Sequence, residues 1–365
     1  MIKSRLVILS FFDNFGGTEN FVQNLIKELN IKNIIIISLT KFDKRFKKQK
    51  NIKYFSLNLR NKTNFFDRIY FFFLAISEIR KIIKKYNPST FISLKNRVNV
   101  LSSIAIYNLK NVNSIGCERT VATEEKNFFW KFLRKFFYRN FDIIVTQDKY
   151  NSNWIKNNCH SIKKILTIPN FINFYENKEK INKKLPKRFN KKKLLLSIGR
   201  LTHTKQFSVL IKIFAKISFK NKDWILAILG NGPEKNNLRK QIIKLKLQNK
   251  IFLIGWVSNT KKWFQKSQAF AFTSKLEGFP NSLQQAVFFQ LPTISFDCKT
   301  GPSQLIINNK SGYLIKNNNE VEYERKLNLL LKNKDLRVKF SKNTEIINNK
   351  LNKKNIIRKW NKLIR

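Results

Sequence analysis

Short apolar runs alternate with longer amphipathic segments along most of this chain, and this rhythm limits the possible fold more than any other feature. The runs expected to be strands are residues 6–11, 33–38, 90–94, 142–146, 194–198, 224–229, 251–254, 269–273 and 293–296. The segments expected to be helices repeat apolar residues at three- and four-residue spacing, and they are 18–29, 65–86, 205–219, 234–247 and 282–289. Such alternation is typical of a parallel sheet covered by helices. We therefore predict an α/β fold.

A polar stretch at residues 171–192 interrupts this rhythm. It is rich in Asn, Lys and Glu and contains Pro186, which is typical of a linker. We therefore predict two Rossmann-like, doubly wound domains that face a cleft, over residues 1–170 and 193–345. Residues 346–365 carry a basic helical pattern, and such a helix can pack back on the N-terminal domain. In folds of this type, ligands bind at the carboxyl ends of the strands.

The composition excludes two classes of protein. Hydrophobic residues make up 42% of the 365 residues, which is too many for a disordered polyelectrolyte. The chain has 3 cysteines, too few for a disulfide framework. The apolar runs at 6–12 and 69–76 are shorter than the roughly 20 residues of a membrane-spanning helix. We therefore expect a cytoplasmic chain that is soluble or lies on a surface.

The net charge is +51, from 73 Lys and Arg against 22 Asp and Glu. Such an excess predicts a polyanionic partner, which could be nucleic acid, anionic lipid or a phosphorylated ligand. Most of these cations are Lys, however, spread along the chain among Asn, Ile and Phe, which share AT-rich codons. Genome composition therefore explains the excess as well. Because the sequence has no zinc finger, helix-turn-helix or RNA-binding motif, we expect no specific nucleic-acid partner.

Glycines follow the predicted strands at two equivalent places. Gly16 and Gly17 precede the first expected helix, where backbone N–H groups and the helix N-terminus can hold an anion. A tight turn capped by Thr18 explains the same residues equally well. Gly230 and Gly232 occupy the corresponding place in the second domain, but the third glycine of a dinucleotide fingerprint is missing.

Charged residues follow other predicted strands of the second domain. Arg200 comes just after a strand and Lys205 begins a helix, so the two cations suit a diphosphate. A pair of this kind also occurs on the solvated surface of Lys-rich proteins. Further along, Glu277 precedes a glycine turn, and Ser282 starts a helix whose N–H groups can point at an anion.

In this order, these segments resemble the retaining glycosyltransferases of family 4, also called glycosyl transferases group 1, which have the two-Rossmann GT-B fold. The resemblance is strongest over residues 193–315. It rests there on Gly199-Arg200-Leu201 with Lys205, Gly230-Asn231-Gly232-Pro233-Glu234, Gly255-Trp256-Val257-Ser258, Glu277-Gly278-Phe279-Pro280-Asn281 and Ser295-Phe296-Asp297-Cys298-Lys299-Thr300-Gly301-Pro302-Ser303. In the first domain, it rests on Gly16-Gly17-Thr18-Glu19 and Cys117-Glu118-Arg119-Thr120.

The resemblance implies retaining transfer of a sugar from a nucleotide donor, with no cofactor and no metal in the site. As catalytic residues, Arg200 and Lys205 would neutralise the departing diphosphate, and Glu277 would contact hydroxyls of the donor sugar. The other donor-binding residues implied are Gly17, Gly199, Trp256, Val257, Gly278, Phe279, Asn281, Ser282, Leu283 and Gln285. Gly16 and Arg119 are implied at the acceptor or the diphosphate. Residues 296–302 resemble members that use a hexose or N-acetylhexosamine on UDP.

Two positions depart from the family pattern. Gln285 replaces the second of two glutamates, so it can bond ribose hydroxyls only without charge assistance. A catalytically weakened sugar-nucleotide binder is therefore an alternative to an active enzyme. Gln206 replaces a glycine, and we expect it to be tolerated on a helix. Neither His160 nor His203 is a convincing base, which fits a mechanism in which the leaving phosphate takes the acceptor's proton.

Residues 128–139 interleave aromatic and basic side chains over three turns. A helix of this kind can lie at the surface of an anionic bilayer. The ordinary alternative, which we slightly favour, is a helix whose aromatic residues face the sheet. Because polyprenyl-diphosphate acceptors are common in the family, we nevertheless expect a glycan or lipid-linked acceptor and peripheral attachment to the inner face of the membrane. Surface polysaccharide or lipopolysaccharide synthesis is the expected role, and non-specific polyanion binding is the least favoured alternative.

Overall fold

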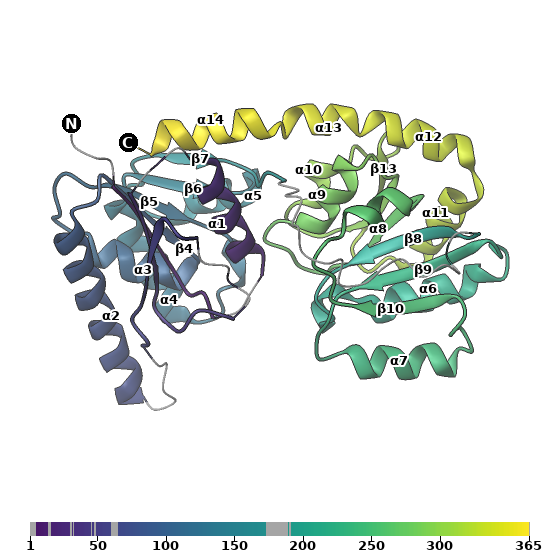
Figure 1. The fold of residues 1–365 in the computed structure, drawn as a ribbon, viewed down its shortest axis with the longest axis horizontal. Helices are drawn as coiled ribbons and strands as arrows, with labels where there is room; N and C mark the ends of the chain where they lie inside the picture. Colours follow the sequence, from purple (N-terminus) through teal and green to yellow (C-terminus); the bar gives the residue numbers. More distant parts are fainter. Residues whose placement is uncertain are drawn as a thin grey trace. The chain divides into compact units, whose positions relative to one another are not determined.

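The structure is a computed structural model that describes residues 5–364 except 14–15, 30, 32, 45, 47–48, 60–64, 173–188 and 190. Its contacts divide the chain into two compact units (Figure 1). The first unit comprises Met1–Phe171 and Lys353–Arg365, and the second comprises Ile172–Asn352. Most of the predicted linker at 171–192 lies outside the described residues.

The first unit is built on a parallel sheet with the strand order β3-β2-β1-β4-β5-β6-β7. The strands are β1 (Arg5–Ser10), β2 (Asn33–Ser38), β3 (Ile52–Ser56), β4 (Thr90–Leu94), β5 (Asn113–Cys117), β6 (Ile143–Thr146) and β7 (Ile165–Thr167). Val7 of β1 lies opposite Ile35 on one side and Phe91 on the other. The strands that follow β1 in the chain therefore lie on both sides of it, first β2 and β3 on one side and then β4 to β7 on the other. The strand order reverses between β1 and β4, and ligands of such sheets bind at this switch point.

Helices cover both faces of this sheet because side chains of β1 alternate between two cores. The helices are α1 (Gly17–Glu28), α2 (Phe65–Tyr86), α3 (Asn96–Ala105), α4 (Phe128–Phe137), α5 (Lys149–Asn158) and α14 (Lys353–Leu363), with short 3-10 turns η1 (Ala122–Glu124) and η2 (Tyr138–Asn140). Leu6 and Ile8 pack in one core with α1 and α14. Val7 and Leu9 pack in the other core with α2 and α3.

Helix α14 completes the core of the first unit although it follows the second unit in the chain. Its apolar side chains Ile356, Trp360 and Leu363 recur at helical spacing and are buried in that core. The Trp360 ring lies 5.5 Å from the Phe21 ring of α1. The basic segment 346–365 is not one helix, because α13 (Glu345–Lys350) ends before α14 begins.

Four phenylalanines of α4 are exposed, namely Phe128, Phe129, Phe132 and Phe136. The expectation that the aromatic residues of this helix face the sheet is therefore wrong for these four. The buried side of α4 instead carries Leu133 and Arg134. No helix within the described residues is both long enough and apolar enough to cross a membrane.

The second unit repeats the architecture, with the strand order β10-β9-β8-β11-β12-β13. Its strands are β8 (Lys193–Ile198), β9 (Trp224–Leu229), β10 (Ile251–Gly255), β11 (Ala269–Phe272), β12 (Thr293–Asp297) and β13 (Gly312–Lys316). Its helices are α6 (Phe207–Ser218), α7 (Lys235–Lys244), α8 (Lys261–Lys266), α9 (Asn281–Phe288), α10 (Pro302–Leu305), α11 (Glu320–Lys332), α12 (Lys334–Asn343) and α13, with a 3-10 turn η4 (His203–Lys205). The switch point lies between β8 and β11. The predicted α/β class with two doubly wound, Rossmann-like units is confirmed.

Candidate functional site

An ion pair lies at the switch point of the second unit. Lys205 at the end of η4 follows β8, Glu277 follows β11, and the Lys205 Nζ bonds Glu277 Oε1. The two side chains are 21% and 10% exposed, so solvent screens this pair less than it screens an exposed one. The sequence predicts each residue separately, and the fold brings their charges together.

Hydrogen bonds fix the loops that carry this pair. Thr273 Oγ1 donates to the Lys205 carbonyl at 2.9 Å, and the Lys275 N–H donates to the Thr204 carbonyl at 2.9 Å. Thr300, in the loop after β12, donates its hydroxyl proton to the Glu277 carbonyl. The loops after β8, β11 and β12 are therefore tied to one another, and the ion pair is held in place before any ligand binds.

The loop after β9 supports the loop that carries Arg200. A Cβ atom at Gly230 would lie 1.8 Å from the Gly199 carbonyl oxygen, and one at Gly232 would lie 2.3 Å from the Leu201 oxygen. The two loops exchange hydrogen bonds through Leu201, whose N–H donates to the Asn231 carbonyl at 3.0 Å. Close backbone packing therefore accounts for both glycines. The Arg200 side chain itself is exposed.

The N-terminus of α9 lies in the same part of the second unit, directly after the loop that carries Glu277. Pro280 precedes this helix and provides no side-chain cap. Within the described part of this unit, the N–H groups of Ser282 and Leu283 donate to no acceptor. Free N–H groups and the helix dipole favour an anion at such an end. Gln285 lies one turn further along, half-buried, and its side chain has no partner among the described residues.

Gly278 and Phe279 precede α9, and Gly301 shapes its start from the loop after β12. Phe279 is buried in the core, whereas Gly278 is partly exposed. Gly301 has φ of 97°, which favours glycine, and a Cβ there would lie 2.1 Å from the Pro280 Cδ. The close approach of Gly301 to Pro280 therefore explains why a glycine stands at this position.

The two residues expected near the base follow β10. Trp256 is exposed and Val257 is buried. In the sheet, β10 is two strands from β8, which corresponds to about 10 Å. His203 lies on η4 and is exposed, whereas His160 is in the first unit. No group of three His, Cys, Asp or Glu side chains that could hold a metal is found among the described residues, and a metal-free site remains a prediction.

Gln206 does not lie within a helix, so the expectation for it is wrong. It stands between η4 and α6 with φ of 50° and ψ of 37°, which is the left-handed region. Its side-chain Oε1 is buried and has no partner. A residue with a Cβ atom is strained in this conformation, whereas the glycine that the family pattern places here is not.

Replacing Gln206 by glycine is expected to raise the free energy of unfolding by about 1 kcal/mol, because the left-handed backbone is then unstrained. Urea denaturation of the folded chain measures this difference. The matched control is Gln241→Gly in the interior of α7, which is expected to lower the same free energy by about 1 kcal/mol. Destabilisation of similar size by both changes would contradict the strain argument.

In the first unit, Gly16 and Lys95 meet at the switch point between β1 and β4. The Gly16 N–H donates to Glu19 Oε2 at 2.9 Å, so Glu19 rather than Thr18 closes the first turn of α1. The buried Glu19 also pairs with Lys95 Nζ at 2.8 Å, and that ammonium donates to the Phe11 carbonyl at 2.7 Å. Lys95 has φ of 76° and ψ of 143°, a strained conformation of the kind found at functional sites. Lys95 was not predicted as a site residue, although it directly follows a predicted strand.

A cavity of about 310 Å³ opens beside Lys95, at the carboxyl ends of β1, β4 and β5. Its lining residues are Phe11, Lys95, Asn96, Arg97, Thr120, Val121, Glu124 and Glu125. Arg97 donates two hydrogen bonds to the Glu125 carboxylate, at 3.0 and 3.1 Å. Burial raises the pKa of Glu125, but the bonds from Arg97 and the Asn127 N–H outweigh it and hold the pKa below its usual value. Asn96 is buried, and its Oδ1 has no partner.

Arg119, which precedes Thr120 of the cavity lining in the sequence, is buried. Its guanidinium stands 3.5 Å from the centroid of the Phe21 ring, and Nη2 donates to Asn170 Oδ1 at 2.5 Å. Burial lowers its pKa to about 10, so the group stays charged at neutral pH. Its Nε and Nη1 are buried without a partner. The expected contact of Arg119 with the acceptor or the diphosphate remains a prediction.

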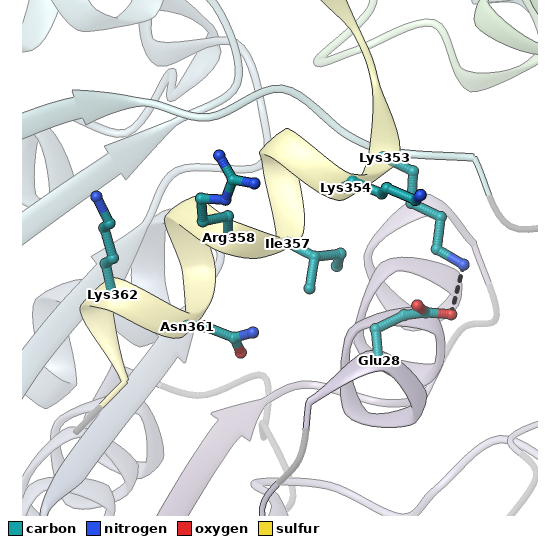
Figure 2. Close-up of a pocket in the computed structure, with 7 residues that line it drawn as sticks. All are labelled: Glu28, Lys353, Lys354, Ile357, Arg358, Asn361 and Lys362. Carbon is teal, nitrogen blue, oxygen red and sulfur yellow. Dashed lines mark hydrogen bonds and ion pairs between the residues drawn. The ribbon is translucent and has the colours of Figure 1, made fainter.

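A larger groove, of about 490 Å³, lies elsewhere on the first unit between α1 and α14. Figure 2 shows Lys353 of α14 paired there with Glu28 of α1, while Arg358 and Lys362 lie further along α14. The pair is 2.7 Å apart. Glu28 ends α1, and Gly16 precedes its start, so the groove is about 18 Å from the glycine loop. It is separate from the strand-end site.

The chain is similar in sequence to glycosyltransferases. Residues 177–346 match the family model of glycosyl transferases group 1. An uncharacterized glycosyltransferase of Methanocaldococcus jannaschii is 32% identical over 63% of this chain, and the match spans only 60% of that relative. A Campylobacter jejuni α-1,4-N-acetyl-D-galactosaminyltransferase, named for a diNAcBac-PP-undecaprenol acceptor, is 25% identical over 96% of this chain and 92% of its own.

The fold is similar to that of solved glycosyltransferases. A variant of S. aureus TarM, in complex with fondaparinux, α-GlcNAc-glycerol and UDP, has a TM-score of 0.76 at 18% identity and covers 100% of both chains. The two Rossmann-like units match the GT-B class of folds. The similarity to glycosyl transferases of group 1 that the motifs indicate is therefore found again over residues 177–346 and in the relatives.

Proposed function

We propose that this chain transfers a hexose or N-acetylhexosamine from a UDP-linked donor to a glycan or lipid-linked acceptor, with retention, in the synthesis of a surface polysaccharide or lipopolysaccharide. The observation that carries this proposal is the Lys205–Glu277 ion pair at the β8/β11 switch point. It lies in the unit that also carries Arg200 and the open N-terminus of α9. The cations and N–H groups can bind a diphosphate, and the Glu277 carboxylate can bind hydroxyls of a sugar.

The donor diphosphate gains negative charge as the sugar leaves, so fixed positive groups stabilise the transition state more than the ground state. Lys205 and Arg200 supply these charges, and the N–H groups of Ser282 and Leu283 supply hydrogen bonds. Glu277 accepts hydrogen bonds from donor-sugar hydroxyls. Because Lys205 is already held by Glu277, its ammonium needs little reorganisation when the donor binds.

The transfer step that fits these residues uses the leaving group as the base. The bond between the anomeric carbon and the diphosphate oxygen breaks while the acceptor hydroxyl oxygen bonds the same face of that carbon. The hydroxyl proton passes to the departing diphosphate. No side chain then has to act as a base at the reacting carbon, and no metal takes part.

We place the acceptor sugar in the cavity beside Lys95 in the first unit. Asn96, Glu124 and Thr120 offer amide, carboxylate and hydroxyl groups there, which are the usual partners of sugar hydroxyls. The name of the Campylobacter relative supports a polyprenyl-diphosphate-linked acceptor. Such acceptors, together with nucleotide donors, fit a site at the inner face of the cytoplasmic membrane.

Thermal unfolding of the whole chain with a panel of nucleotide sugars tests the donor assignment. UDP-hexoses and UDP-N-acetylhexosamines are expected to raise the unfolding temperature by mass action, and the stabilising donors should then be hydrolysed slowly or transferred. If no nucleotide or nucleotide sugar stabilises the fold, the proposed function fails.

Replacing Gln285 by glutamate is expected to raise turnover about fivefold, because a charge-assisted bond to a ribose hydroxyl is about 1 kcal/mol stronger than a neutral one. Initial rates with the stabilising donor measure the change. Gln290→Glu, just after α9 and exposed, is the control and should leave the rate unchanged. Donor binding without turnover in both the parent chain and Gln285→Glu would indicate a binder rather than an enzyme.

A further inference from the structure

Exposed aromatic and apolar side chains on α2 and α4 make up a surface of the first unit. We call it the aromatic face, and it consists of Phe66, Ile69, Tyr70, Phe73, Phe128, Phe129, Phe132 and Phe136. Phe72 of α2 joins the two helices, since its ring lies 5.8 Å from that of Phe129 and 5.9 Å from that of Trp130. Exposed patches of this extent mark interaction sites on folded chains.

Folding of the unit does not account for this face. Helix α2 already buries Phe71, Ala75, Ile79 and Ile83, spaced four residues apart, against the sheet. Phe66 is 82% exposed and Phe128 is 80% exposed, so neither contributes much to the core. Both helices therefore carry a second apolar side in addition to the one they pack on the protein.

Cations alternate with the aromatic residues of α4 along the sequence. Residues 126–139 include Lys126, Lys131, Lys135 and Arg139 and contain no acidic residue. Lys135 and Arg139 are exposed. Aromatic side chains interleaved with cations suit the interface of an anionic bilayer, where the rings enter the headgroup region and the cations meet lipid phosphates. A second copy of this chain would instead bring the same cations against one another.

We propose that the aromatic face docks on an anionic lipid bilayer, with α2 and α4 lying against the headgroups. The cavity beside Lys95 adjoins this surface. Arg97 of the cavity stands 5.5 Å from the Trp130 ring, and Glu125 of the cavity accepts the N–H of Asn127, the cap of α4. Docking therefore holds the mouth of the cavity close to the lipid. The use of the cavity by a lipid-linked acceptor rests on the proposed function, whereas the docking itself does not.

Co-sedimentation of the whole chain with vesicles tests the docking. Binding is expected to phosphatidylglycerol mixed with phosphatidylethanolamine, and much less to phosphatidylcholine alone. The double change Phe66→Ser with Phe128→Ser should lower the partition coefficient at least tenfold. The matched control is Phe219→Ser in the second unit, where the side chain is 74% exposed, and it should change nothing. An equal loss in both variants would overturn the proposal.

A second pair of double variants tests the contribution of the cations of α4 to vesicle binding. Lys131→Gln with Lys135→Gln should weaken binding to the anionic vesicles about 25-fold, or about fivefold for each cation. Lys235→Gln with Lys240→Gln, on α7, removes the same charge from elsewhere and should have little effect. Equal losses in the two pairs would mean that only the overall charge matters, and would overturn docking through this face.

Transfer assays separate this proposal from the proposed function. If the double phenylalanine variant loses vesicle binding and transfer to a vesicle-embedded acceptor but keeps transfer to a soluble one, both proposals stand. If no form of the chain binds vesicles and transfer to the soluble acceptor persists, the docking proposal alone fails. Dimerisation that depends on Phe128 and persists without lipid would assign the face to a protein partner, and would also overturn it.

Discussion

Replacing Lys205 by methionine is expected to lower the rate of sugar transfer about a thousandfold while the chain stays folded. The methionine keeps the length of the side chain but removes the positive charge beside the departing diphosphate, and groups of this kind contribute about 10²- to 10³-fold each. Initial rates with the stabilising nucleotide sugar measure the change, and circular dichroism checks the fold. This prediction rests on the proposed function.

Lys212→Met is the matched control for this change. Lys212 is also paired with a glutamate, Glu320, at 3.1 Å, but on the exposed surface of α6 and α11. It should leave the rate unchanged. Because Lys205→Met leaves the partly buried Glu277 without its partner, the double variant Lys205→Met with Glu277→Gln should be more stable than the single one. An unchanged rate of sugar transfer in Lys205→Met would show that Lys205 takes no part in the mechanism.

Replacing Gly230 by alanine is expected to lower the free energy of unfolding by about 4 kcal/mol. The added Cβ would lie 1.8 Å from the Gly199 carbonyl oxygen, and φ of 145° strains any residue with a side chain. The loop after β9 or the loop that carries Arg200 must move, so donor binding should weaken as well. Urea denaturation and the thermal shift with donor measure the two effects.

Gly16→Ala provides the comparison for this change. Gly16 has extended φ, and the nearest heavy atom to a Cβ there would be Glu19 Oε2 at 3.5 Å, an ordinary contact. This alanine should change the free energy of unfolding by no more than about 0.5 kcal/mol. If the two alanine variants were equally stable, the close approach at Gly230 would not be a constraint on the fold.

The rhythm of apolar runs was sufficient to predict the α/β class and two Rossmann-like units, because buried parallel strands have a strong local signature. Strands with a weaker signature were not identified. β5 reads Asn-Ser-Ile-Gly-Cys, and its Gly116 is explained by the side chains of Phe141 and Ile144, which lie 2.8 and 2.9 Å from the place of a Cβ. β3 is an edge strand whose side chains are only partly buried.

The candidate site was predictable as far as its residues follow predicted strands. Glu277 and Lys205 were both chosen from the sequence, but their ion pair depends on the adjacency of β8 and β11, which is a property of the whole sheet. Lys95 was missed because its strained backbone and its bond to Glu19 arise from long-range packing. Gln206 was assigned to a helix because a left-handed residue between two helical turns has no local signature unless it is glycine.

The path of the chain through the first unit has a consequence for its synthesis. Trp360 and Ile356 fill the core beside α1, yet the ribosome makes them only after the entire second unit. The first unit therefore emerges with an open apolar surface around Phe21, which is covered when α14 arrives. Residues 1–171 made alone would expose this surface and are expected to aggregate, because the core of the first unit is completed only after the second unit has been synthesised.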